Sequence, residues 1–164
     1  MIEYRKGNVL DAPAGSIIVH GCNAAGVMGS GVALAVKKRY PEAFEVYLRE
    51  FYVNKLTLGG ITFYKTPDET TIINGITQKT YGTYPQRYVD YEAVSKVFEK
   101  IVDDVKYLHP QSVINESFDF DAPQPYVLAF PKIGAGLGGG SWDVISAIID
   151  EAVPDTWKKV CYTF

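Results

Sequence analysis

A glycine-rich segment is the part of this sequence best suited to ligand chemistry. Five of the fifteen glycines lie within residues 134–140, directly after an apolar run at 126–130 and before a helical pattern that starts at Ser141. Glycine lets the backbone approach a ligand closely, and a helix N-terminus carries partial positive charge. The segment therefore predicts a phosphate-binding loop. The alternative is a tight turn whose glycines only allow strand and helix to pack closely.

Two common nucleotide motifs do not account for this loop. Residues 134–139 read Gly-Ala-Gly-Leu-Gly-Gly, which fits the G-x-G-x-x-G pattern of dinucleotide-binding domains. That motif also needs an acidic residue about 20 positions later for the ribose. Here the next predicted strand ends the chain at Thr163 and Phe164, and no Gly-Lys-Ser or Gly-Lys-Thr occurs. The sequence thus argues against a conventional NAD domain and against a Walker loop.

A second glycine-containing loop also lies between a strand and a helix. Residues 26–31 read Gly-Val-Met-Gly-Ser-Gly; they follow the apolar run at 16–20 and precede a helical stretch at 32–39. By itself this loop is equally consistent with a simple helix start. Ligands of open α/β sheets bind beyond the carboxyl ends of the strands, so two such loops favour a cleft for a ligand with two phosphates.

Two polar residues flank the second loop. His20 ends the predicted strand and Asn23 follows it. The histidine is either a titratable group near the ligand or a buried residue hydrogen-bonded to the backbone. The Asn23 amide either holds a sugar hydroxyl or only satisfies the loop backbone.

Strands and helices alternate along most of the chain. Apolar runs predict strands, and apolar residues three or four apart predict helices. The predicted strands cover residues 2–6, 16–20, 61–65, 71–77, 126–130 and 159–163, and the predicted helices cover 32–39, 42–52, 90–108 and 141–152. This order predicts one α/β domain over residues 1–164 with a largely parallel sheet in its middle. The segment from Leu108 to Pro125 is the longest predicted loop.

Composition narrows the function classes. The 164 residues are 47% hydrophobic and 21% charged, with a formal net charge of −3. A weakly acidic chain is poorly suited to wrap nucleic acid through a basic surface. Cys22 and Cys161 with two histidines give no zinc-ligand spacing, and nothing else requires a metal or cofactor. No apolar run reaches the roughly 20 residues of a membrane span, and the first residues lack a signal-peptide pattern, so we expect a soluble cytoplasmic protein.

Several segments together resemble the macro domain superfamily. They read Lys-Gly-Asn-Val-Leu at 6–10, Ile-Val-His-Gly-Cys-Asn at 18–23, Gly-Ser-Gly-Val-Ala at 29–33 and Arg-Tyr-Pro at 39–41. The branch they resemble most is that of the ADP-ribose 1″-phosphate phosphatases. Residues 131–137 with Trp142, and the terminal residues 160–164, are similar to the related ADP-ribosyl-glutamate hydrolases. The similarity runs nearly from end to end, with the segment from Leu108 to Pro125 outside it.

This resemblance implies a three-layer α/β/α sandwich with a mixed central sheet and a cleft for ADP-ribose. Gly7, Asn8 and Val9 would meet the adenine, with Asn8 standing where many macro domains have an aspartate. Asn23 would face the distal ribose, and His20 falls where the phosphatase branch has a histidine implicated in activity. The residues expected to wrap the diphosphate are Gly29, Ser30, Gly31, Val32, Ile133, Gly134, Ala135, Gly136, Leu137 and Gly138.

The hydrolase branch fits less well at its catalytic positions. That branch has a catalytic aspartate where this chain has Gly138, and a lysine nucleophile after the Ile-Thr pair, where this chain has Gln78 and then Lys79. The resemblance therefore implies hydrolysis of ADP-ribose 1″-phosphate to ADP-ribose and phosphate, with water as nucleophile and with His20 and Asn23 as catalytic residues. An ADP-ribosyl hydrolase acting on modified macromolecules and a non-catalytic ADP-ribose-binding module remain the alternatives. The oligomeric state is left open.

Overall fold

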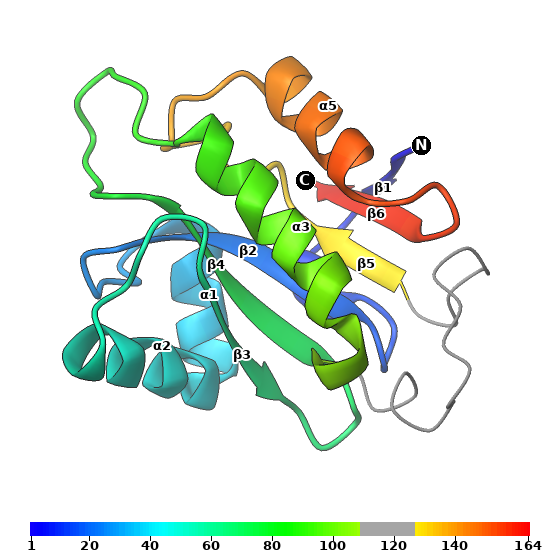
Figure 1. Cartoon of the computed structure of the whole chain (residues 1–164), viewed down its shortest axis with the longest axis horizontal. Coiled ribbons are helices and arrows are strands. Elements are labelled where there is room, and N and C mark those ends of the chain that lie inside the picture. Colours follow the sequence, from blue (N-terminus) through cyan, green and yellow to red (C-terminus); the bar gives the residue numbers. More distant parts are fainter. Residues whose placement is uncertain (109–126) are drawn as a thin grey trace.

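A computed structural model describes residues 1–108 and 127–164 (Figure 1). The long loop predicted up to Pro125 lies outside the described residues, apart from Leu108 at the end of a helix. Both chain ends lie at the same edge of the central sheet.

Six strands form this sheet, in the order β1-β6-β5-β2-β4-β3. All neighbouring pairs are parallel except β3 and β4, which are antiparallel. The predicted strands and the mixed, largely parallel sheet are therefore confirmed. One boundary was wrong: the strand predicted to end at His20 continues to Asn23, because residues 21–23 also pair with the neighbouring strand, so His20 lies in the interior of the strand. The strands are β1 (Glu3–Lys6), β2 (Ile17–Asn23), β3 (Ile61–Lys65), β4 (Thr71–Gln78), β5 (Val127–Phe130) and β6 (Lys158–Thr163).

The predicted helices are confirmed as α1 (Gly31–Arg39), α2 (Pro41–Val53), α3 (Tyr91–Leu108) and α5 (Trp142–Ala152). Their ends have local causes. Pro41 occupies the first turn of α2, where its fixed backbone angle suits a helix start. Ser141 caps α5, since its hydroxyl accepts from the Val144 N–H at 3.5 Å. The short 3-10 helix η1 (Val9–Asp11) was not predicted; the Asn8 side chain caps it by accepting from the Leu10 N–H at 2.9 Å.

The helices cover both faces of the sheet. Alternate residues of β2 point to opposite sides: Ile17 and Val19 pack in the core beneath α3 and α5, whereas Ile18 packs in the core with η1, α1 and α2. Figure 1 shows α3 crossing in front of the sheet, with α1 behind it. The three-layer α/β/α sandwich implied by the resemblance is thus confirmed.

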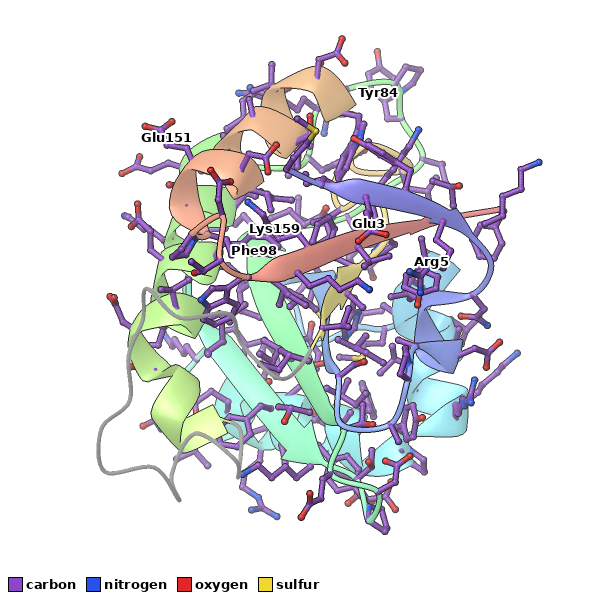
Figure 2. The ribbon with its side chains drawn as sticks, turned by 90° about the vertical axis from the view of Figure 1, so that its right-hand side faces the viewer. Glu3, Arg5, Tyr84, Phe98, Glu151 and Lys159 are labelled. Carbon is purple, nitrogen blue, oxygen red and sulfur yellow. The ribbon has the colours of Figure 1, made fainter. Side chains whose placement is uncertain are left out.

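A buried lysine side chain links strand β6 to helix α5. The Lys159 side chain of β6 is 0% exposed, and its ammonium lies 3.0 Å from Asp150 Oδ1 of α5. The same group donates to the Val153 carbonyl at 3.1 Å. Figure 2 shows Lys159 on β6, with Glu151 on the outer surface of α5. This contact ties the C-terminal strand to the helix before it.

Five strands of the sheet run parallel: β1, β6, β5, β2 and β4. The loops that follow β1, β2, β4 and β5 therefore all lie at the carboxyl ends of the strands, which we call the carboxyl edge of the sheet. The two predicted ligand loops follow β2 and β5, so the topology brings them together. No helix in the described ranges is long and apolar enough to cross a membrane.

Candidate functional site

A cavity of about 660 Å³ opens at this carboxyl edge of the sheet. Its walls come from the segments that follow β2, β4 and β5. The lining residues are 21–23, 27, 29–33, 77, 78, 81–83, 131–134 and 136–138. The volume is within the range of clefts that bind small molecules.

Most of the predicted diphosphate-binding residues line this cavity. They are Gly29, Ser30, Gly31, Val32, Ile133, Gly134, Gly136, Leu137 and Gly138, together with the predicted ribose-binding residue Asn23. Ala135 belongs to the same loop but does not line the cavity. The placement of the two loops is confirmed, and their contacts with a ligand stay a prediction.

The predicted adenine-binding residues lie beside the cavity. Gly7, Asn8 and Val9 follow β1 and are not among its lining residues. Val9 is buried in a core cluster, and Val32, which lines the cavity, packs against the same cluster. The Asn8 carboxamide oxygen is engaged in the cap of η1. An adenine contact at these residues stays a prediction.

His20 does not reach the cavity, contrary to the position expected for a group that contacts substrate. Its side chain is 0% exposed and its Nε2 lies 2.6 Å from Asn74 Oδ1 of β4. The Asn74 amide nitrogen already donates to the Ala43 carbonyl and to Thr62 Oγ1. Asn74 Oδ1 is therefore the acceptor, and His20 holds its proton on Nε2.

The environment of His20 keeps the imidazole neutral. Burial lowers its pKa to about 4, and the hydrogen bond with Asn74 opposes only part of that effect. The Cys22 sulfur lies 3.7 Å from each ring nitrogen, and Cys22 itself lines the cavity. His20 is thus one residue removed from the cavity wall, and its hydrogen-bond partner is a side chain rather than the backbone. Its catalytic role stays a prediction.

Asn23 lines the cavity and also organises the loop after β2. Its Oδ1 accepts from the Ala25 N–H at 3.0 Å and from the Tyr47 hydroxyl at 2.9 Å. Its Nδ2 donates to the Val27 carbonyl at 2.8 Å. An amide nitrogen has two hydrogens, and within the described ranges Nδ2 has this one acceptor, so a second N–H of Asn23 can donate toward a ligand.

Backbone N–H groups without protein acceptors are available at both loops. The N–H groups of Ser30 and Gly31, at the start of α1, donate to no acceptor within residues 1–108 and 127–164, and the Ser30 side chain makes no capping bond. The same holds for the N–H groups of Gly136 and Leu137. Free N–H groups at a helix N-terminus and in a glycine loop suit an anion such as phosphate.

Packing explains most glycines of the segment 134–140, as the alternative interpretation held. A Cβ at Gly138 would lie 2.7 Å from the Gly134 carbonyl oxygen, and one at Gly134 would lie 2.6 Å from Val89 Cγ2. Gly139 and Gly140 are similarly restricted. At Gly136 a Cβ would meet no atom within 4 Å, and this residue faces the cavity. Packing therefore does not require glycine at position 136, and a side chain there would extend into the cavity.

The cavity is almost uncharged. Among its lining residues only Lys132 carries a formal charge, and no carboxylate is present. The ammonium of Lys132 acts on the Cys161 thiol of β6, although burial still raises the pKa of that thiol to about 11. In the described ranges no group of three histidine, cysteine or acidic residues is placed to hold a metal ion.

Comparison with known proteins identifies the family. The model of the Macro domain family matches residues 19–149, which include most of β2, all of β4 and β5, and both cavity loops. The chain is a member of the macro domain family.

Relatives of two named activities match this macro domain. It is 27% identical over 155 residues to the DNA ADP-ribosyl glycohydrolase of Thermus aquaticus, covering 93% of this chain but only 38% of the relative. It is 24% identical over 159 residues to the ADP-ribose 1″-phosphate phosphatase of Candida albicans, covering 92% of this chain and 93% of the relative. The solved macrodomain of Thermus aquaticus DarG superposes with a TM-score of 0.74 at 25% identity, covering 100% of this chain and 99% of that one.

The sequence did not identify most of one wall of the cavity. Thr77, Gln78, Tyr81, Gly82 and Thr83 come from β4 and the loop after it. This loop is fixed on the glycine-rich loop, because the N–H groups of Tyr88 and Val89 both donate to the Gly138 carbonyl, at 2.8 and 3.0 Å. The resemblance had pointed to Gln78 of this wall, as the position of the hydrolase branch's lysine; for residues 81–83 the only sequence signal was their position after a strand parallel to the one that ends at Asn23.

Proposed function

We propose that this macro domain binds the ADP-ribose portion of ADP-ribose 1″-phosphate and hydrolyses its terminal phosphomonoester. The observation that carries the proposal is that N–H groups at residues 30–31 and at 136–137, which have no acceptor within residues 1–108 and 127–164, line one cavity without a carboxylate among its lining residues. Such donors stabilise a diphosphate without a cluster of cations. The related proteins, named for ADP-ribose derivatives, support this class of ligand.

Two cavity residues favour the phosphatase over the glycohydrolase. Gln78 and Gly138 line the cavity at the positions where the resemblance expects the lysine nucleophile and the catalytic aspartate, and Lys79 is not a lining residue. The carboxamide of Gln78 is not a nucleophile, and Gly138 has no carboxylate. These two residues therefore cannot take the roles of the lysine and the catalytic aspartate.

The proposed reaction needs positioning and electrostatic stabilisation more than a protein nucleophile. Water attacks phosphorus, the bond between phosphorus and the anomeric oxygen breaks, and the proton from water ends on that oxygen, giving ADP-ribose and inorganic phosphate. The free N–H of Asn23 orients the distal ribose, and the loop N–H groups hold the diphosphate. In this proposal His20 lies behind Cys22 of the wall, 3.7 Å from its sulfur, and acts without touching the substrate.

Phosphate release and ligand binding test the proposal together. The expected result is release of inorganic phosphate from ADP-ribose 1″-phosphate, with calorimetric binding of ADP-ribose. Asn23→Ala should lower both by about 10-fold or more, because it removes the ribose contact and loosens the loop. Asn54→Ala is the matched control, since that amide is exposed at the end of α2.

The competing functions give different results. Binding of ADP-ribose without phosphate release would indicate a binding module. Release of ADP-ribose from a modified protein or nucleic acid, with the phosphomonoester left intact, would indicate the glycohydrolase. Folded protein that binds no ADP-ribose at millimolar concentration would overturn the proposal as a whole.

A further inference from the structure

A second cavity, which we call the annex, adjoins the first. It has a volume of about 540 Å³ and shares Gly82, Thr83, Gly136 and Leu137 with the main cavity. Residues 84–87 and Gly139 form its remaining walls. The proposed function assigns no ligand group to it.

The strand order places the annex at one end of the main cavity. Its walls come from the loop after β4, whereas the expected adenine contacts follow β1, and these two strands are separated by β6, β5 and β2. A ligand with its adenine near β1 and its distal ribose at Asn23 would direct the substituent of that ribose toward the annex. This orientation rests on the proposed function.

One cation is held in the annex wall. The Arg87 guanidinium lies 4.4 Å from the centroid of the Tyr91 ring, and the Tyr91 hydroxyl accepts from the Ser141 N–H at 2.9 Å. Stacking of this kind fixes the plane of a guanidinium. The hydrogen bond from the Ser141 N–H lowers the pKa of Tyr91, and a hydrogen bond from Arg87 to the Tyr91 hydroxyl contributes to the same effect. A guanidinium has five N–H donors, so others remain for a ligand. The backbone on either side of Arg87 is also held, since Gln86 packs on Gly139 and Tyr88 bonds to Gly138.

No carboxylate of the described residues neutralises the charge of Arg87. The annex lining contains no carboxylate, and Arg87 makes no ion pair within residues 1–108 and 127–164. Tyr84, Pro85 and Gln86 are uncharged, and Figure 2 shows Tyr84 at the outer edge of the molecule on this loop. An arginine fork held in this way matches the oxygens of a phosphate group.

We propose that the annex receives the terminal phosphate of the ligand and that Arg87 pairs with it. A phosphomonoester carries about −1.5 to −2 charge at neutral pH, and the loop N–H groups are already assigned to the diphosphate. The annex volume leaves room for the attacking water and for departure of free phosphate. Arg87 then distinguishes ADP-ribose 1″-phosphate from ADP-ribose, which lacks that charge.

Arg87→Met tests this assignment because it keeps the length of the side chain and removes its charge. The kcat/KM for phosphate release from ADP-ribose 1″-phosphate should fall at least 10-fold, with partial recovery in Arg87→Lys. The inhibition constant of the product ADP-ribose should change less than about 2-fold. Arg49→Met, on α2 and outside both cavities, is the matched control and should match the unmodified protein.

Failure of this proposal can be distinguished from failure of the proposed function. If the unmodified protein releases no phosphate, calorimetry with both ligands replaces the kinetic assay. A selective loss of ADP-ribose 1″-phosphate affinity in Arg87→Met would then still support the annex. Equal effects of Arg87→Met on both ligands, or no effect on either, would overturn it even if phosphate is released.

Discussion

The buried His20 should make the stability of the fold depend on pH between neutrality and pH 5. Burial lowers the pKa of His20 to about 4 in the folded protein, whereas an unfolded histidine has a pKa near 6.5. The unfolded chain therefore binds the proton first as the pH falls. The stability that the neutral buried imidazole contributes is fully present above about pH 6.5 and is lost as the pH falls toward 4.

The size of this effect follows from the two pKa values. Each pH unit between them changes the free energy of unfolding by about 1.4 kcal/mol for one proton. Lowering the pH from 7 to 5 should thus cost about 2 kcal/mol from His20 alone. That change is a large fraction of the stability of an ordinary domain, so urea denaturation at the two pH values will resolve it.

His20→Gln isolates this contribution. Glutamine can still donate to Asn74 Oδ1 but does not titrate, so the variant should lose about 2 kcal/mol less than the unmodified protein between pH 7 and pH 5. The carboxylates and His109 are present in both proteins and cancel in the difference. An equal pH dependence of the two proteins would show that His20 takes up protons freely in the folded state, contrary to its burial.

The same variant distinguishes a structural from a catalytic histidine. Loss of a general acid or base usually lowers a rate by about 10²- to 10⁴-fold. Because His20 lies outside the cavity, His20→Gln should keep phosphate release at pH 7 within about 10-fold of the unmodified protein. A loss of 10²-fold or more in a folded variant would restore the catalytic role that the sequence resemblance implied.

Two further substitutions test the loop and the link between β6 and α5. Gly136→Glu should abolish the thermal shift caused by ADP-ribose, because its carboxylate enters the cavity. Gly136→Ala should leave the ligand-free stability within about 0.5 kcal/mol of the unmodified protein. An unchanged thermal shift in the glutamate variant would mean that the loop does not contact the ligand. Lys159→Met should lower the free energy of unfolding by about 1.5–3 kcal/mol, since the Val153 carbonyl loses a charged donor. The exposed neighbour Lys158→Met should have almost no effect, and equal losses would refute the proposed link.

The sequence by itself determined the order of the elements and the position of two cavity walls. Hydrophobic periodicity, Pro41 and Ser141 are local signals, so strands and helices appeared where they were predicted. Parallel strands with crossover helices then force the loops after them onto one edge of the sheet. The loops around Gly31 and Gly136 met there for that reason.

The tertiary structure alone decided what surrounds each of these residues. His20 is buried against Asn74, 54 positions away, so no local pattern distinguished a wall-forming histidine from one behind the wall. The glycines at 134 and 138 are required by Val89 and by the backbone of their own loop, whereas Gly136 is not. The annex and Arg87 depend on the loop after β4 docking on Gly138. Each of these environments comes from segments distant in sequence, whose spacing and orientation are set only when the core packs.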